Sequence, residues 1–243
     1  MFNIDFLHMI RSHEVEKIIQ LLPQEAKVLE IGGGSGHQAK LLKDRGFDIT
    51  SIDVADSIYA DEQVFPVQTY DGKKLPFADQ SFDVVLSSNV LEHIHDLDPL
   101  MEEFSRVVKP SGFNLHVMPT GSWRFWTIVA NYFEFLQILL LSFSPAKLKN
   151  PKHWGKQLLV NIYNHLIPPR HGEFGNCFSE IWSFRPKRWQ KYFEKHAFLI
   201  SKSEQMGLFY TGHMLFNKKI SISRREKLAK FLGSSCHLFV LKK

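Results

Sequence analysis

The stretch that decides the fold is KVLEIGGGSG, residues 27–36. Its first five residues predict a short β-strand, and the glycines after them predict a tight loop. A helix is expected over 37–45, ended by Gly46, and a second strand over 48–54 carries Asp53 near its end. A strand, a glycine loop, a helix and a strand that ends in an acid form the opening unit of a doubly wound nucleotide-binding fold.

The alternation of strands and helices continues to about residue 120 and returns near the end of the chain. Further strands are expected over 64–67, 83–88, 113–118, 198–203 and 237–241, and helices over 14–22, 97–108 and 186–196. The run Lys109-Pro110-Ser111-Gly112 predicts a turn before the fifth strand. We expect one α/β domain over 1–243, a doubly wound and mostly parallel seven-stranded sheet. A helical insertion over 121–182, after the fifth strand, would be a substrate cap or a membrane-facing segment.

The acids around the glycine loop indicate the kind of ligand. Gly32, Gly34 and Gly36 allow backbone N–H groups to approach a ligand closely, although a purely structural turn would use glycines as well. Glu30 stands where a dinucleotide-binding loop keeps an apolar residue, and its charge would repel a pyrophosphate but attract a cation. Asp53 is placed to accept hydrogen bonds from ribose hydroxyls, the alternative being a turn or helix cap. A cationic nucleoside without phosphates, S-adenosylmethionine, fits these signs.

Three motifs resemble those of class I S-adenosylmethionine-dependent methyltransferases, in the branch with quinone-biosynthesis and small-molecule enzymes. They are VLEIGGGSG at 28–36, DGKKLPFADQSFDVV at 71–85 and SNVLEHI at 88–94. The resemblance covers about residues 25–118 and implies the methyltransferase fold, methyl transfer and S-adenosyl-L-methionine as cofactor. The cofactor-binding positions it implies are Glu30, Gly32, Gly34, Gly36, Asp53, Asp71, Gly72 and Asn89.

The resemblance also implies a role for each position. Glu30 and the glycine loop would hold the methionine end, and Asp53 the ribose. Asp71 would accept from the adenine amine, with the N–H of Gly72 on the ring, although alanine is commoner there than this glycine. Asn89 would border the methionine moiety and the substrate.

The sequence of the insertion suggests where a general base would lie. His171 and Glu173 follow a proline-rich turn and are bounded by glycines, which would present either side chain to a cleft as a proton acceptor. The alternative is a surface loop with incidental polarity. Of the other histidines, His116 is expected to be buried and hydrogen-bonded.

No metal site is expected from the sequence. His93 and His95, two residues apart on an expected helix, would not share a face, and His93 would belong to a packed helix cap. Cys177 and Cys236 lack metal-ligand spacing and are expected to be buried thiols.

Residues 125–143 predict a helix with a wide apolar face. The polar positions fall within an arc of roughly 140°, and they are Thr127, Asn131, Glu134, Gln137 and Ser142. Glu134 near the middle argues against a transmembrane span. Three interpretations stay open: the helix lies flat on a membrane, caps a site for a lipid-like substrate, or packs on the core or a second subunit. Nearby lysines that would favour a membrane interface are Lys147, Lys149, Lys152 and Lys156. The nearby Trp123, Trp126 and Trp154 suit an interface but suit a core as well.

Charge divides the chain in two. Residues 1–120 hold 10 Lys and Arg against 19 Asp and Glu, whereas residues 121–243 hold 20 against 6, within an overall net charge of +5. The basic half could meet an anionic substrate, a nucleic acid or an anionic membrane surface, and charge alone does not choose among them. Together with the apolar helix, it suggests an enzyme with a small-molecule or lipid-linked acceptor, a glycan or quinone-type intermediate near a membrane. An RNA methyltransferase is the alternative, weakened by the absence of a visible RNA-binding module, and a non-catalytic membrane-associated scaffold is another. With two cysteines and no apolar leader, the chain is expected in the cytoplasm, with the inner face of the membrane as its site of attachment.

Overall fold

The computed structural model describes residues 4–55, 63–142, 151–214 and 217–243, in which seven strands form one sheet in the order β3-β2-β1-β4-β5-β7-β6. Strand β7 is antiparallel to both of its neighbours, and all other neighbouring pairs are parallel. The expected doubly wound, mostly parallel seven-stranded sheet is therefore confirmed. The strands are β1 (Lys27–Ile31), β2 (Asp48–Val54), β3 (Gln68–Tyr70), β4 (Phe82–Ser88), β5 (Val108–Pro119), β6 (Leu199–Gln205) and β7 (Cys236–Lys242).

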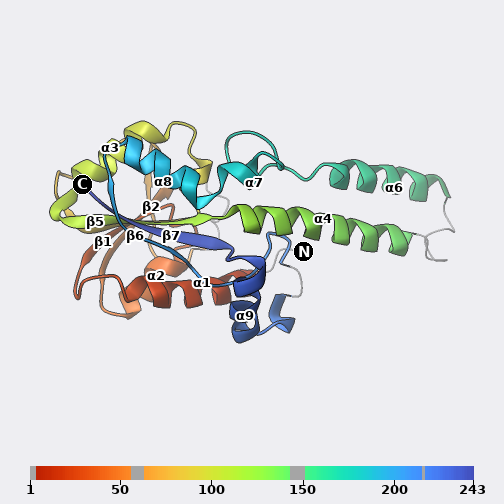
Figure 1. The fold of residues 1–243 in the computed structure, drawn as a ribbon, viewed down its shortest axis with the longest axis horizontal. Helices are drawn as coiled ribbons and strands as arrows, with labels where there is room; N and C mark the ends of the chain where they lie inside the picture. The colour runs from red at the N-terminus through yellow and green to blue at the C-terminus, as the bar shows by residue number, and fades with distance from the viewer. Residues whose placement is uncertain (1–3, 56–62, 143–150, 215–216) are drawn as a thin grey trace.

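Helices cover both faces of the sheet (Figure 1). On one face lie α1 (Ile4–Ile19), α2 (His37–Asp44) and α9 (Ile222–Leu232), and on the other α3 (Leu97–Val107) and α8 (Pro186–Lys195). Each face has its own apolar core, because consecutive strand residues point to opposite sides. In β4, for example, Val84 and Leu86 pack on the α1 side and Val85 on the α3 side.

The insertion after β5 forms α4 (Gly121–Ser142), α6 (Pro151–Leu166) and the short α7 (Glu180–Ser183). Helices α4 and α6 run side by side and extend away from the sheet (Figure 1). Hydrogen bonds join them, among the described side chains, from Asn131 Nδ2 to the carbonyl of His165 at 3.0 Å and from the Tyr132 hydroxyl to that of Leu166 at 3.1 Å.

Several element boundaries differ from the sequence predictions. Helix α1 begins at Ile4, ten residues before the expected start, because Phe6 and Ile10 extend its buried face toward the N-terminus. Strand β3 begins only at Gln68, after Pro66, which has no N–H for a ladder. The expected turn before the fifth strand is instead an irregular start of β5, with a register shift in its pairing with β4.

Helix α9 has no counterpart among the predictions. It is mostly polar, and its fully buried positions include a cation, Arg225, so its apolar periodicity is weak. Two lysines and one aromatic residue of the predicted membrane-facing segment, Lys147, Lys149 and Phe143, lie outside the described residues.

Candidate active site

The strand order reverses between β1 and β4, and the expected cofactor-binding residues gather at the carboxyl ends of these strands. In doubly wound folds this point is where ligands bind. A cavity of about 1350 Å³ opens there, larger than the roughly 300–1,000 Å³ of a pocket for one small ligand. The expected site residues that line it are Glu30, Gly32, Gly34, Asp53, Asp71, Gly72, Asn89 and His171, whereas Gly36 and Glu173 do not.

The backbone conformation of the loop explains why glycines occur at alternate positions. Gly32, Gly34 and Gly36 all have positive φ, at 72°, 55° and 74°, where other residues are strained. A Cβ on Gly32 would also lie 2.3 Å from Cγ2 of Val90, in the loop after β4. Gly36 serves as the N-cap of α2 rather than as a wall of the cavity. The alternating glycines thus allow the two loops to meet closely at the cavity.

Glu30 lies at the base of the loop and is almost completely buried. Its Oε1 accepts from Gln38 Nε2 at 2.9 Å, and its Oε2 accepts from the Ser51 hydroxyl at 2.5 Å. Burial raises the pKa of Glu30 to about 7, and the two hydrogen bonds offset only part of that effect. Near neutral pH this carboxyl therefore changes its charge readily, and a cation placed beside it would favour the ionised form.

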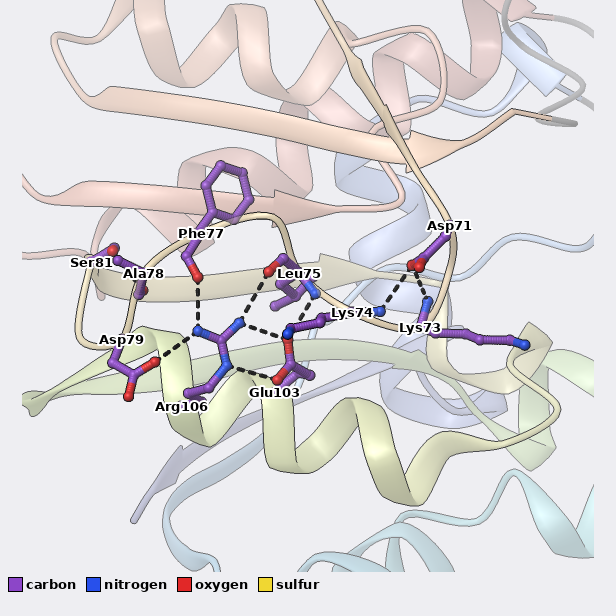
Figure 2. Close-up of polar contacts among 10 residues, drawn as sticks. All are labelled: Asp71, Lys73, Lys74, Leu75, Phe77, Ala78, Asp79, Ser81, Glu103 and Arg106. Atoms are coloured by element: carbon purple, nitrogen blue, oxygen red, sulfur yellow. Dashed lines mark hydrogen bonds and ion pairs between the residues drawn. The ribbon is translucent and has the colours of Figure 1, made fainter.

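Asp53 and Asp71 bring two more carboxylates to the cavity. Asp53, at the end of β2, accepts from the N–H of Gly34 at 2.8 Å and so ties β2 to the glycine loop. Oδ1 of Asp71 accepts from the N–H groups of Lys73 and Lys74, both at 2.9 Å (Figure 2). These bonds lower the pKa of Asp71 and keep it ionised at the cavity wall.

The rest of the motif after Asp71 has a structural role, which Figure 2 shows. Arg106 of α3 donates to the carbonyls of Leu75 and Phe77 and pairs with Asp79 at 2.8 Å. Glu103, one turn earlier on α3, accepts from Arg106 and from the N–H of Leu75. The loop that carries Asp71 is thereby fixed to α3, although it lacks regular secondary structure of its own.

Sequence reasoning missed Arg11, which lines the cavity from α1. It pairs with the buried Glu14 at 2.5 Å. With the Asn89 amide oxygen turned toward it, the orientation that satisfies both groups, Asn89 accepts from Arg11 Nη1 at 2.8 Å and Nη2 at 3.0 Å. Asn89 itself has φ 55°, a conformation that asparagine tolerates better than most residues. Arg11 belongs to no motif, and it lies before residue 14, where the sequence predicts the start of the first helix.

At the other end of the cavity, the insertion brings His171 against the turn η2 (Leu91–His93). Glu180 of α7, fully buried, accepts from the N–H groups of His171 and Gly172, both at 2.7 Å. Arg124 of α4 pairs with Glu180 at 2.6 Å. A Cβ on Gly172 would lie 2.8 Å from the carbonyl oxygen of Glu92, so only glycine fits here without a shift. The insertion thus builds one wall of the site.

The remaining predicted residues have clear positions. Glu173 donates its N–H to the Glu92 carbonyl, but its side chain lies near Arg170, 3.8 Å away, rather than in the cavity. His116 is buried and bonded to Ser87 at 2.8 Å, as expected, and burial lowers its pKa to about 3. Cys177 and Cys236 are buried free thiols, which confirms that prediction. His93 belongs to the turn η2 and not to the expected helix, and its ring lies 4.7 Å from that of His171.

Helix α4 is amphipathic, but its polar side faces the protein and its apolar side is exposed. Thr127 and Asn131, in its polar arc, are buried, and Glu134 pairs with His213 at 2.8 Å. The opposite side carries six exposed apolar residues at helical spacing, between 38% and 68% accessible, which we call the apolar stripe. They are Phe125, Val129, Tyr132, Phe133, Leu136 and Leu140. Trp123, Ile128 and Ala130 of the same helix are buried, so α4 packs on the described core with its inner side and not with these six side chains. Among the described helices, none is long and apolar enough to cross a bilayer.

Known proteins resemble the chain in sequence and in fold. Residues 29–115 match the methyltransferase domain family. A demethylmenaquinone methyltransferase of Corynebacterium glutamicum (strain R) is 34% identical over 143 residues, which cover 55% of this chain and 58% of that protein. A SAM-dependent methyltransferase of Archaeoglobus fulgidus has the same fold, with a TM-score of 0.56, 20% identity and coverage of 97% and 94% of the two chains. One of Mesorhizobium loti gives a TM-score of 0.56 at 14% identity, covering 95% and 98%.

Fold, site and relatives define an α/β enzyme class that binds a nucleoside cofactor at the switch point of its sheet. Residues 29–115 match a methyltransferase domain, and the chain has the fold of class I S-adenosylmethionine-dependent methyltransferases, whose cofactor is S-adenosyl-L-methionine. The residues present fit this group. Three carboxylates, Glu30, Asp53 and Asp71, surround the glycine loop, an arrangement that suits a cationic nucleoside and disfavours a pyrophosphate.

Proposed function

We propose that this protein methylates a lipid-linked, quinone-type acceptor at a membrane surface. The observation that carries the proposal is the cavity at the switch point, which exceeds the size of a pocket for one small ligand and joins the glycine loop to an apolar wall. That wall includes Phe6, Ile10 and Trp123. A demethylmenaquinone methyltransferase among the relatives supports an acceptor of this chemistry.

The glycine loop and the carboxylates of Glu30, Asp53 and Asp71 would hold the cofactor by complementary charge. Glu30 and the loop N–H groups would take the amino acid end, Asp53 the ribose hydroxyls, and Asp71 with the N–H of Gly72 the adenine. Arg11 would face the carboxylate of the same ligand or of the acceptor. S-adenosylmethionine, when bound, supplies a methyl group on a sulfonium, whose transfer leaves a neutral thioether. The protein's contribution is then to align the acceptor and exclude water.

His171 is the residue we assign to accept a proton from a hydroxyl acceptor. Its ring lines the cavity, 4.6 Å from that of Trp123, and its position is fixed by Glu180. Glu173, the other expected base, does not line the cavity, and we assign it to holding the loop on η2. An activated ring carbon as acceptor would depend less on a base.

The apolar stripe supports attachment to a membrane. Trp123, at the start of α4, lines the cavity, and the stripe begins two residues later, so a lipid-like acceptor could pass from the bilayer to the site along one helix. An apolar face on an interfacial helix inserts at the boundary between headgroups and acyl chains. The basic second half of the chain would add attraction to anionic lipids.

Two measurements test the proposal. Calorimetric titration with S-adenosylmethionine, followed by transfer of a labelled methyl group into fractionated lipids, soluble metabolites and RNA of a cell extract, should place the label in the lipid fraction. Label in RNA alone would contradict the acceptor class, and binding without transfer to any fraction would favour a scaffold.

Flotation with vesicles of phosphatidylglycerol and phosphatidylethanolamine tests the membrane part. The wild-type chain should float, and the double variant L136E/L140E should not. The matched control is Phe231→Glu, the same kind of change at an exposed aromatic residue on α9, 86% accessible, which should still float. Equal flotation of all three proteins would contradict attachment through the stripe.

A further inference from the structure

Three side chains with metal-binding atoms meet where the insertion lines the cavity. Glu92 and His93 come from the turn η2, and His171 comes from the insertion. Their ligand atoms all lie within 4.8 Å of one another. Oε1 of Glu92 lies 3.8 Å from Nε2 of His93 and 3.7 Å from Nε2 of His171, too far for hydrogen bonds. Ligands of one tetrahedral zinc ion lie about 3.4 Å apart, so these distances need only small side-chain adjustments.

The carboxylate of Glu92 has no hydrogen-bond partner among the described residues, on either oxygen. Its side chain is 0% exposed. A cation beside it stabilises a buried carboxylate that accepts no hydrogen bond. The nearby Arg124 already pairs with Glu180 at 2.6 Å. A cation between Glu92 and the two imidazoles would therefore stabilise a carboxylate that the described residues leave without a hydrogen bond.

We propose that Glu92, His93 and His171 bind one divalent transition-metal ion of the zinc type. One carboxylate and two imidazoles form a ligand set of catalytic zinc sites, in which a fourth position stays open. Both imidazoles line the cavity, with side chains 46% and 33% exposed, so the open position faces the place of the acceptor. An acceptor oxygen bound there would have a lowered pKa, which favours its attack on a methyl group.

This site goes beyond the proposed function, because an ion can bind whether or not a methyl group is transferred. It also changes the role of His171. Nε2 of His171 cannot hold a metal ion and accept a proton at the same time, so an ion at this site would replace His171 as the means of activating a hydroxyl acceptor.

The test is direct metal binding to the full chain, made free of metal with a chelator and carrying no histidine tag. Co²⁺ is titrated and followed by its visible absorption, and Zn²⁺ is then added to displace it. We expect one equivalent of Co²⁺ per chain, displaced by one equivalent of Zn²⁺. Glu92→Gln and His171→Ala should each weaken binding at least about tenfold. The control His95→Ala removes a histidine that lines the same cavity but lies outside the cluster, and it should bind as the wild type does.

Two results would overturn the proposal. One is no saturable Co²⁺ or Zn²⁺ binding by the folded wild-type chain. The other is equal affinity in the wild type and His171→Ala, which would place the ion on other members of the twelve histidines. If Glu92→Gln does not fold, His93→Ala replaces it, because the His93 side chain is half exposed. None of these readouts depends on methyl transfer, so a failure of the proposed function would leave the outcome interpretable.

Discussion

Replacing Glu30 with glutamine should make the protein more stable at alkaline pH while weakening its hold on the cofactor. The folded chain raises the pKa of this carboxyl from 4.5 to about 7, mainly by burial. Between these two values the unfolded chain has lost the proton and the folded chain keeps it, so the free energy of unfolding falls as the pH rises. At about 1.4 kcal/mol per pH unit, the full difference amounts to about 3 kcal/mol, complete above pH 7.

Glutamine removes this dependence without removing the local hydrogen bonds. Its carbonyl oxygen can accept from Gln38, and its amide can donate to the Ser51 hydroxyl. The free energy of unfolding of the variant, minus that of the wild type, should therefore rise by about 3 kcal/mol between pH 4.5 and pH 8. Urea unfolding at half-unit steps of pH measures it. Glu102→Gln, an exposed carboxyl on α3, is the control and should follow the wild-type curve. Parallel curves for the wild type and E30Q would refute the reasoning.

The same carboxyl should couple cofactor binding to proton release. If the ammonium group of the cofactor lies beside Glu30, binding at pH 6 favours ionisation and expels a proton. Calorimetry in buffers of different ionisation enthalpy should show that release in the wild type and not in E30Q. Proton release that persists in the variant would mean that another group titrates.

Three further changes test other parts of the site. Arg106→Met should lower the free energy of unfolding by about 2 kcal/mol in urea unfolding and weaken cofactor binding, because the loop with Asp71 loses its attachment to α3. Gly32→Ala should abolish calorimetric cofactor binding, and adding Val90→Ala should restore it only in part, since the clash is relieved but the positive φ is not. Arg124→Met should lower the free energy of unfolding, measured by thermal unfolding, by about 3–5 kcal/mol, because it leaves the buried carboxylate of Glu180 unpaired. Adding Glu180→Gln should recover part of that loss.

The sheet and its switch point could be predicted because their signals are local. Buried parallel strands give short apolar runs, and the glycine pattern follows from three positive φ angles at alternate positions. The boundaries were less predictable where tertiary contacts decide them. Helix α1 starts early because Phe6 packs under the sheet and contacts the guanidinium of Arg225, 219 positions further along the chain.

The cluster of Glu92, His93 and His171 was not predictable in the same way. In the sequence, the histidine nearest to His93 is His95, two residues away, and this spacing predicts no shared metal site. The partner that the fold provides is His171, from the loop after α6, and no periodicity relates the two positions. Arg11 was missed for a similar reason, since its contact with Asn89 joins α1 to the end of β4. Long-range pairs of this kind depend on the packing of the insertion and of α1 on the sheet.

Helix α4 links the two proposed activities of the insertion. Its inner side carries Arg124, which holds Glu180 and through it the backbone of His171, while its outer side carries the apolar stripe. A rotation or displacement of α4 on a membrane would therefore move the support of the acceptor site as well. If so, anionic vesicles should change the rate of methyl transfer to a short, water-soluble acceptor that needs no extraction from the bilayer. The L136E/L140E variant should lose that response while keeping the rate of methyl transfer that it has without vesicles. If the variant responds to vesicles as the wild type does, the apolar stripe does not transmit membrane contact to the site.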